Sequence, residues 1–160
     1  MRSRVHVKML AGDYPCHAYL RSDRDQDPAC PLCRYLFPEY SAPSDSMVHL
    51  LTSSRATSDT RAEYIPLLLN TISKHFPHNQ ILNQPNHTQM TQLLLDPTSL
   101  NLPISVRISA EHPAFTHVLA ACRTYCYAIH RDRTKQLTSI KTKQWQNYFW
   151  LGQIVCSTTL

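Results

Sequence analysis

Glycine is scarce in this chain of 160 residues, which holds two glycines and eleven prolines. Tight turns between strands often depend on glycine, because several turn types need positive φ angles. Proline is accepted in the first turn of a helix but interrupts helix interiors. The composition therefore favours helices separated by prolines over a sheet, and we expect a mostly α fold with a single helical domain.

Long hydrophobic runs are also missing. The opening residues MRSRVHVKML include no apolar stretch of signal-peptide length, and the most apolar late stretch, residues 145–155, is shorter than the roughly 20 residues of a membrane-spanning helix. We expect an intracellular protein of the nucleus or cytoplasm, neither secreted nor associated with a membrane. In a reducing compartment the six cysteines are better explained as metal ligands or core residues than as disulfides.

Acidic residues are outnumbered by Lys and Arg, 11 to 16, and the net charge of +5 is unevenly distributed. Residues 1–24 and 123–160 are basic, whereas residues 25–122 are mildly acidic. Basic ends suit a polyanionic partner such as RNA or DNA, whose phosphates attract them without regard to sequence. An ordinary solvated surface explains a charge excess of this size equally well.

Apolar residues recur at helical spacing in several segments, and prolines or glycines separate these segments. The sequence predicts four parts: a basic amphipathic helix segment (1–24), an irregular, proline-punctuated knuckle segment (25–56), a helical segment (57–140) and an aromatic extension (141–160). Within the third part we expect a helix over 57–76 in which Pro66 makes a kink or marks a new first turn, a helix capped by Asn86 that ends at Asp96-Pro97, an extended stretch over 100–108 and a long helix over 113–140.

The clearest local motif is Cys30-Pro31-Leu32-Cys33, followed by His49 after fifteen intervening residues. Two thiolates at this spacing can hold one side of a tetrahedral Zn²⁺ ion, and a downstream helix can supply further ligands. A fourth ligand at H-x4-C spacing is replaced by Ser54, whose hydroxyl is a poor zinc ligand. Water, Cys16 or His17 could instead complete the shell. A thioredoxin-like redox pair is disfavoured, because no βαβ pattern surrounds the motif.

Three stretches, HVKMLAGDYPCHAYL, DPACPLC and SMVHLLTSSRATSDTR, resemble the region after the reverse transcriptase domain in non-LTR (LINE-type) retrotransposon polyproteins. A later stretch, LNLPISVRISAEHPAFTHVLAACRTYCYAIHRDRTKQL, is similar to the helical segment that closes some of these polyproteins, so the resemblance covers residues 2–140. These proteins have a C-x-x-C…H-x4-C zinc knuckle between a basic helix and a helical segment, usually with a shorter loop before the histidine. On this resemblance Cys30, Cys33 and His49 match the first three ligands.

The resemblance implies a zinc-dependent accessory segment that binds RNA or DNA with weak sequence specificity. The polymerase motif Tyr-x-Asp-Asp is absent from these 160 residues, and none of the nine histidines belongs to a nucleophile–base pair. We therefore expect no catalytic activity, as for a segment that lacks the polymerase domain or for a decayed remnant. The residues expected to contact phosphates are basic and lie near the two ends of the chain: Arg2, Arg4, Lys8, Arg131, Arg133 and Lys135.

Two further features leave alternatives open. Cys122, Cys126 and His130 share a helix face but extend about 12 Å along it, too far for one ion, so core packing is the better interpretation. The aromatic residues of 141–160 could stack on bases or contact a protein partner. The alternative function is thus a metal-free helical module for protein interaction or structure, with residues 141–160 as its contact surface.

Overall fold

A computed structural model of the protein describes residues 2–11, 14, 29–77, 85–99 and 113–156, without the side chains of Arg2, Ser99 and residues 143–156. The predicted mostly α fold is confirmed, and the described residues form helices joined by loops, with one isolated β-bridge between Ala29 and Ser44. None of the described helices combines the length and the apolar character needed to cross a bilayer.

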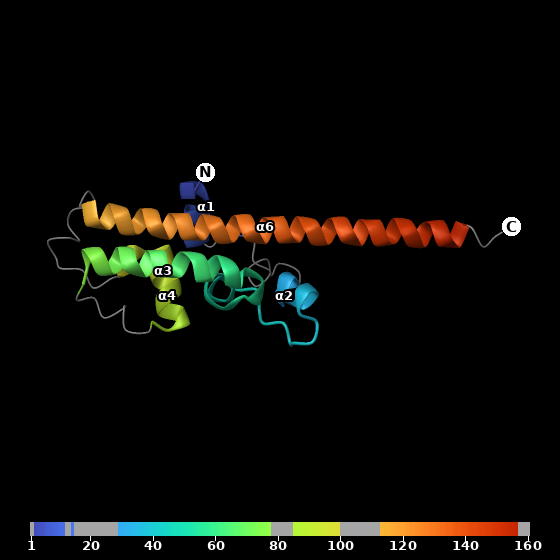
Figure 1. Ribbon diagram of the computed structural model, residues 1–160, viewed down its shortest axis with the longest axis horizontal. Helices are drawn as coiled ribbons and strands as arrows, with labels where there is room; N and C mark the ends of the chain where they lie inside the picture. The colour runs from blue at the N-terminus through green and yellow to red at the C-terminus, as the bar shows by residue number, and fades with distance from the viewer. Residues whose placement is uncertain (1, 12–13, 15–28, 78–84, 100–112, 157–160) are drawn as a thin grey trace.

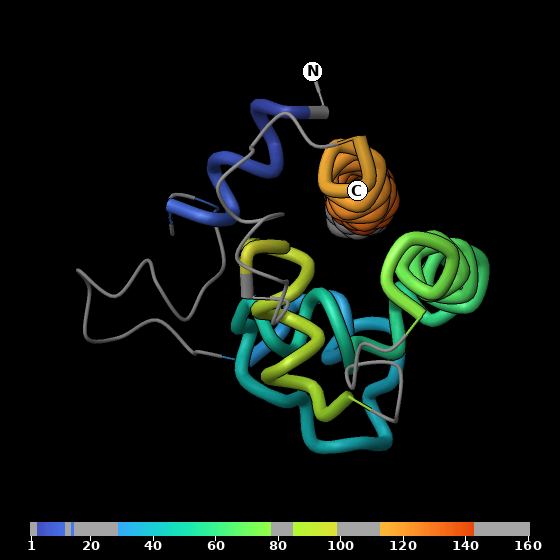
Figure 2. The backbone as a smooth tube through the Cα atoms, turned by 90° about the vertical axis from the view of Figure 1, so that its left-hand side faces the viewer, coloured from blue at the N-terminus to red at the C-terminus, as the bar shows by residue number. Residues whose placement is uncertain are grey.

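The longest helix, α6 (Pro113–Cys156), runs along the whole molecule (Figure 1). Helix α3 (Ser58–His75) lies antiparallel to it, since the His75 and His117 rings stack at one end while the Thr60 hydroxyl donates to Asp132 further along. Viewed along α6, the helices α1 (Arg2–Leu10) and α3 lie on different sides of it (Figure 2). Helix α6 is therefore the central helix of the fold, and α1 and α3 pack against it.

Five shorter elements complete the described structure. They are α2 (Pro31–Leu36), the π-helix η1 (His49–Ser53), the 3₁₀-helix η2 (Arg55–Thr57) and α4 (His87–Leu95), which the 3₁₀-turn η4 (Pro97–Ser99) follows. Asn86 caps α4 as predicted, because its side chain accepts from Gln89 N–H while the Gln89 side chain accepts from Asn86 N–H. Helix α4 ends at the residue before Asp96-Pro97, also as predicted.

Helix α3 includes Pro66 within one element of 18 residues, so this proline does not begin a new helix. The structure corrects two other details of the expected helices. Within the segment expected to be irregular, Pro31 begins the short helix α2, because the first helical position needs no N–H donor. Helix α6 begins at Pro113 as expected but extends beyond Ile140 to Cys156. The predicted extended stretch over 100–108 lies outside the described residues.

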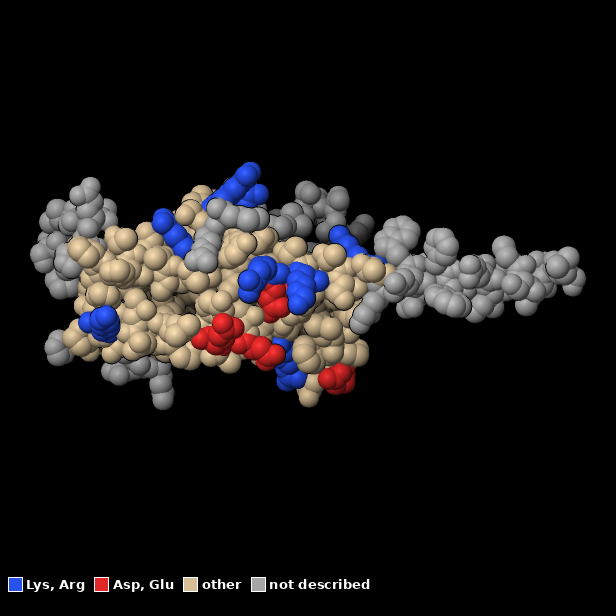
Figure 3. Space-filling view, turned by 45° about the horizontal axis from the view of Figure 1, so that its top comes forward, with Lys and Arg blue, Asp and Glu red and all other residues tan. Residues whose placement is uncertain are grey.

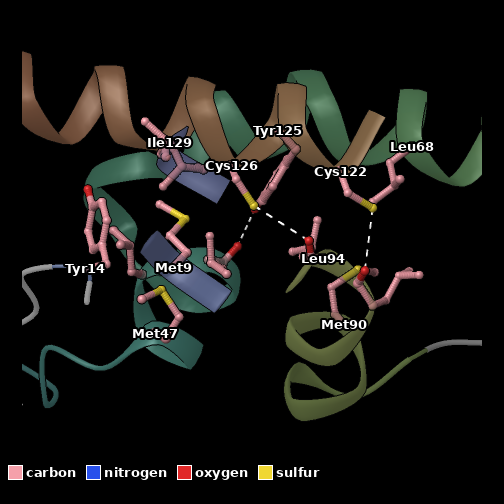
Figure 4. Packing of buried hydrophobic residues seen from close by; sticks show 14 of the residues in the cluster. Met9, Tyr14, Met47, Leu68, Met90, Leu94, Cys122, Tyr125, Cys126 and Ile129 are labelled. Atoms are coloured by element: carbon pink, nitrogen blue, oxygen red, sulfur yellow. Dashed lines mark hydrogen bonds between the residues drawn. The ribbon is translucent and has the colours of Figure 1, made fainter. Parts of the chain in front are cut away.

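The core forms where α6 meets α1, α3, α4 and η1. Figure 4 shows Met9, Met47 and Met90 beneath the side chains of α6. The Cys122 and Cys126 thiols donate to the carbonyls of Leu93 and Leu94, which fits their interpretation as core residues. The cluster of buried residues comprises Val5, Met9, Tyr14, Met47, Leu50, Leu51, Leu68, Ile72, Met90, Leu93, Leu94, Val118, Cys122, Tyr125, Cys126 and Ile129.

Candidate metal centre

The three predicted ligands come together in a second, smaller buried cluster beside α6. The Sγ atoms of Cys30 and Cys33 and a ring nitrogen of His49 all lie within 4.8 Å of one another, and each of the three residues is buried. Thiolate and imidazole are the donors that tetrahedral zinc sites use. Sequence spacing alone thus identified three side chains that the fold does place together.

Local backbone structure positions the two cysteines. Cys30 precedes the first residue of α2 and Cys33 is the third residue of that helix, so the two thiols lie on the same side of its first turn. Cys30 N–H donates to the Pro43 carbonyl at 2.8 Å, next to the bridge between Ala29 and Ser44. These contacts close the loop from α2 to η1.

The π-helix η1 explains how His49 and Ser54 reach the same site. In an α-helix, residues five apart point about 140° away from each other. Here Ser54 N–H donates to the His49 carbonyl at 2.7 Å, the i→i+5 bond of a π-helix, which brings the two residues closer to one face. Ser54, five residues after His49, can therefore reach the same site because a π-helical turn is wider than an α-helical one.

The distances around Cys33 suit a tetrahedral ion. Its Sγ lies 3.3 Å from His49 Nε2 and 3.6 Å from Ser54 Oγ. Zn–S bonds near 2.3 Å and Zn–O bonds near 2.1 Å, at tetrahedral angles, separate sulfur and oxygen by about 3.6 Å. Ser54 is completely buried. Its hydroxyl thus lies at the distance from Cys33 that a fourth ligand of the same ion would have.

Further contacts orient the imidazole of His49. Its Nδ1 lies 3.3 Å from Ser53 Oγ, and its backbone N–H donates to Ser46 Oγ at 3.2 Å. If Nδ1 carries the proton and donates to Ser53, the lone pair of Nε2 faces the two thiols. A hydrogen bond of this kind on the distal ring nitrogen is typical of metal-binding histidines.

Burial sets the protonation of the site. Burial, together with the nearby carboxylate of Asp45, raises the pKa of the Cys30 thiol to about 12. Burial lowers the pKa of His49 below its usual value, with Arg61 and Arg133 acting in the same direction. At neutral pH the imidazole is therefore neutral and able to bind a cation, while a metal ion must displace the proton of Cys30.

A buried ion pair connects this site to α6. The Arg133 guanidinium donates to both carboxylate oxygens of Asp45, at 2.8 and 2.7 Å, and both side chains are almost completely buried. This finding corrects the expectation that Arg133 contacts phosphate, because its charged group is enclosed and already paired. The pattern of basic residues near the C-terminus could not separate Arg133 from its exposed neighbours.

Four of the other five residues expected to contact phosphate have exposed side chains. Arg4 and Lys8 of α1 are exposed, as are Arg131 and Lys135 of α6, whereas the Arg2 side chain lies outside the described part. Figure 3 shows basic side chains over α1 and α6 on one face, with most acidic ones lower on that face. Cys16 and His17, named as alternative zinc ligands, also lie outside the described residues.

Sequence reasoning missed three residues around the site. Neither Asp45 nor Ser53 belongs to a sequence motif. Asp45 pairs with Arg133, 88 residues away, and Ser53 contacts His49, four residues away. Arg61 donates to the carbonyl of Ser54 and to Thr57 Oγ1 at 2.9 Å, so it holds the turn that presents Ser54. Arg61 belongs to no sequence motif of the site, so only the folded turn relates it to Ser54.

Comparisons with known protein families, with curated proteins and with solved structures found no match.

Proposed function

We propose that this chain is a zinc-stabilised helical module that binds RNA or DNA and has no catalytic activity of its own. The observation that carries the proposal is the buried cluster of Cys30, Cys33 and His49, whose donor atoms lie within 4.8 Å of one another. The resemblance to the segment after the reverse transcriptase domain of non-LTR retrotransposon polyproteins supports the same reading.

Zinc is the ion that best suits these donors. Two thiolates and an imidazole select a borderline-soft cation, whereas magnesium and calcium prefer oxygen ligands. Two thiolates neutralise a divalent cation, and the adjacent pair of Asp45 and Arg133 adds no net charge. The site can therefore hold the ion without leaving an unbalanced charge in the buried cluster.

The role of zinc would be structural. Bound between Cys30 and Cys33 at the start of α2 and His49 of η1, it would join two elements that residues 37–48 separate in the sequence. The buried cluster there comprises Cys30, Leu32 and Cys33, with Leu137 and Ile140 of α6 packed against it. Ser54 would complete the coordination weakly, as a neutral oxygen donor.

Four exposed basic residues support the nucleic-acid part of the proposal. Arg4 and Lys8 lie on α1, and Arg131 and Lys135 lie one turn apart on α6. Lys8 is close enough to α6 to lower the pKa of His130, which relates the two basic surfaces in space. Contacts to phosphate would make binding weakly sequence-specific and strongly dependent on salt.

Zinc stoichiometry tests the first half of the proposal. We expect about one zinc ion per chain in protein purified without chelator, as a structural site requires. Cys30→Ser should lose it, whereas Cys122→Ala, which removes a buried thiol outside the site, should retain it. Zinc-free protein with unchanged helicity would contradict the proposal and favour the metal-free interaction module.

Fluorescence anisotropy with labelled RNA and DNA across a salt series tests the second half. The double variant Arg131→Gln/Lys135→Gln should weaken binding and reduce the salt slope by about two, since each phosphate contact contributes about one. The control Lys74→Gln removes an exposed cation from the far end of α3. A complex insensitive to salt, or one weakened equally by both variants, would count against a phosphate-binding surface on α6.

A further inference from the structure

A pocket of about 290 Å³ opens beside the candidate metal centre. Its walls include the side chains of Phe37, Tyr40, Ala42 and Pro43, from the loop between α2 and η1. Pockets that hold small organic molecules begin at about 300 Å³ and are lined mainly by apolar groups with a few polar ones. The pocket therefore has the size and lining for one compact ligand with an apolar body.

A single cation lies at this pocket. Arg55 contributes to the lining, and its guanidinium carbon lies 3.7 Å from the centre of the Tyr40 ring. In the described part of the chain no carboxylate lies within ion-pair distance of Arg55, and no acidic residue lines the pocket. Stacking on Tyr40 leaves the edge of the guanidinium, which carries its N–H donors, able to bind an anion.

The inner side of the pocket is polar and belongs to the metal centre. Cys33, His49 and Ser53 line it, whereas Cys30 and Ser54 do not. The pocket thus meets only part of the site, and Ser53, whose hydroxyl lies 3.3 Å from His49 Nδ1, lines it as well. A ligand could enter without displacing either Cys30 or Ser54.

We propose that this pocket binds a small organic carboxylate, whose carboxylate pairs with Arg55 and whose planar apolar body packs against Phe37, Tyr40 and Pro43. A planar carboxylate matches the two-pronged geometry of the guanidinium. One cation in a mainly apolar pocket suits a singly charged carboxylate better than a phosphate, which usually recruits several donors. The proposal is independent of the nucleic-acid function and of the identity of the metal.

Benzoate is a suitable probe, because it combines a planar ring with one carboxylate. We expect benzoate at up to roughly 10 mM to shift the NMR amide signals of the residues that line the pocket, in a saturable way. Benzamide, which has the same shape without charge, should bind about tenfold more weakly or not at all. Zinc content is measured in the same samples.

Variants identify the cation responsible. Arg55→Gln should weaken benzoate binding about tenfold without changing zinc content, whereas the control Arg34→Gln, an exposed arginine on α2 outside the pocket, should leave it unchanged. Equal binding of benzoate and benzamide, or no saturable shift, would overturn the proposal. Binding that requires zinc and survives Arg55→Gln would also overturn it, because the carboxylate would then bind the metal.

Discussion

Arg133 of α6 and Asp45 of the loop before η1, 88 residues apart in sequence, form a buried two-pronged ion pair beside the candidate metal centre. The positive charge of Arg133 and the negative charge of Asp45 directly compensate each other near the site. Their contact holds the loop before η1, the element that carries His49, against the central helix α6. The pair therefore joins the knuckle segment to the helical segment.

Removing only one partner of this pair should destabilise the protein strongly. Arg133→Met should lower the free energy of unfolding by about 3–5 kcal/mol, because it leaves the Asp45 carboxylate buried without a counter-charge. Urea unfolding followed by circular dichroism measures the loss. The double variant Arg133→Met/Asp45→Leu should recover most of it. A double variant no more stable than Arg133→Met would show that the pair itself is not the cause.

Replacing Ser54 by cysteine should tighten zinc binding. A thiolate is a far better zinc ligand than a neutral hydroxyl, so Ser54→Cys should increase affinity by at least about tenfold, and Ser54→Ala should reduce it by less. Competition with a chelator of known affinity measures both. Ser53→Cys, one residue earlier, serves as the control for adding a thiol nearby. Unchanged affinity in Ser54→Cys would mean that this side chain does not face the ion.

The hydroxyl of Tyr125 should stabilise the π-helix that carries His49. Tyr125 donates to the carbonyl of Leu51 within η1, and its side chain is almost completely buried. Tyr125→Phe leaves that carbonyl without its buried donor and should cost about 1–3 kcal/mol. Thermal unfolding measures this cost, with Tyr64→Phe, a half-buried tyrosine of α3, as the control. Equal effects of the two variants would contradict a specific role for this hydrogen bond.

Acidification should destabilise the metal-free protein. Burial lowers the pKa of His130 below its usual 6.5, and Arg133 and Lys8 lower it further, while Tyr14 shares a hydrogen bond with its ring. The unfolded chain therefore binds protons at a higher pH than the folded chain does, so the stability contributed by neutral His130 is complete above about pH 6.5 and is lost as the pH falls through the folded pKa.

Urea midpoints measured on metal-free protein between about pH 7.5 and about pH 5 test this direction. His130→Gln should flatten part of the decline, although the partial exposure of the ring limits the effect. His49, whose pKa is also lowered, should account for another part. The exposed His87 of α4 provides the control, and a His87→Gln profile as flat as that of His130→Gln would refute the assignment.

The cap of α4 should contribute to stability independently of the metal centre. Asn86→Ala removes the side-chain acceptor of the Gln89 N–H and should cost about 1 kcal/mol. Gln92→Ala, at an exposed position of the same helix, should change stability by less. Chemical unfolding compares the two, and similar losses would mean that the capping interaction has little weight.

Much of the fold could be read from local patterns. The start of α6 at Pro113, the cap at Asn86 and the end of α4 before Asp96-Pro97 follow from the chemistry of single residues in their immediate sequence. Local patterns could not decide whether the helix continues past Pro66 or begins again there, and in the structure α3 continues. Its packing against α6 is a tertiary contribution that outweighs the local cost of a proline.

The sequence by itself determined the donor types of the candidate site, because Cys30, Cys33 and His49 are recognisable from residue type and spacing. Only the tertiary structure decided that Arg133 is buried against Asp45 while its neighbour Arg131 is exposed, because helical charge patterns do not reveal which turn meets a distant loop. It also decided that Ser54 faces Cys33, since that depends on the wider turn of η1. Local chemistry specifies which groups are present, and packing specifies which of them meet.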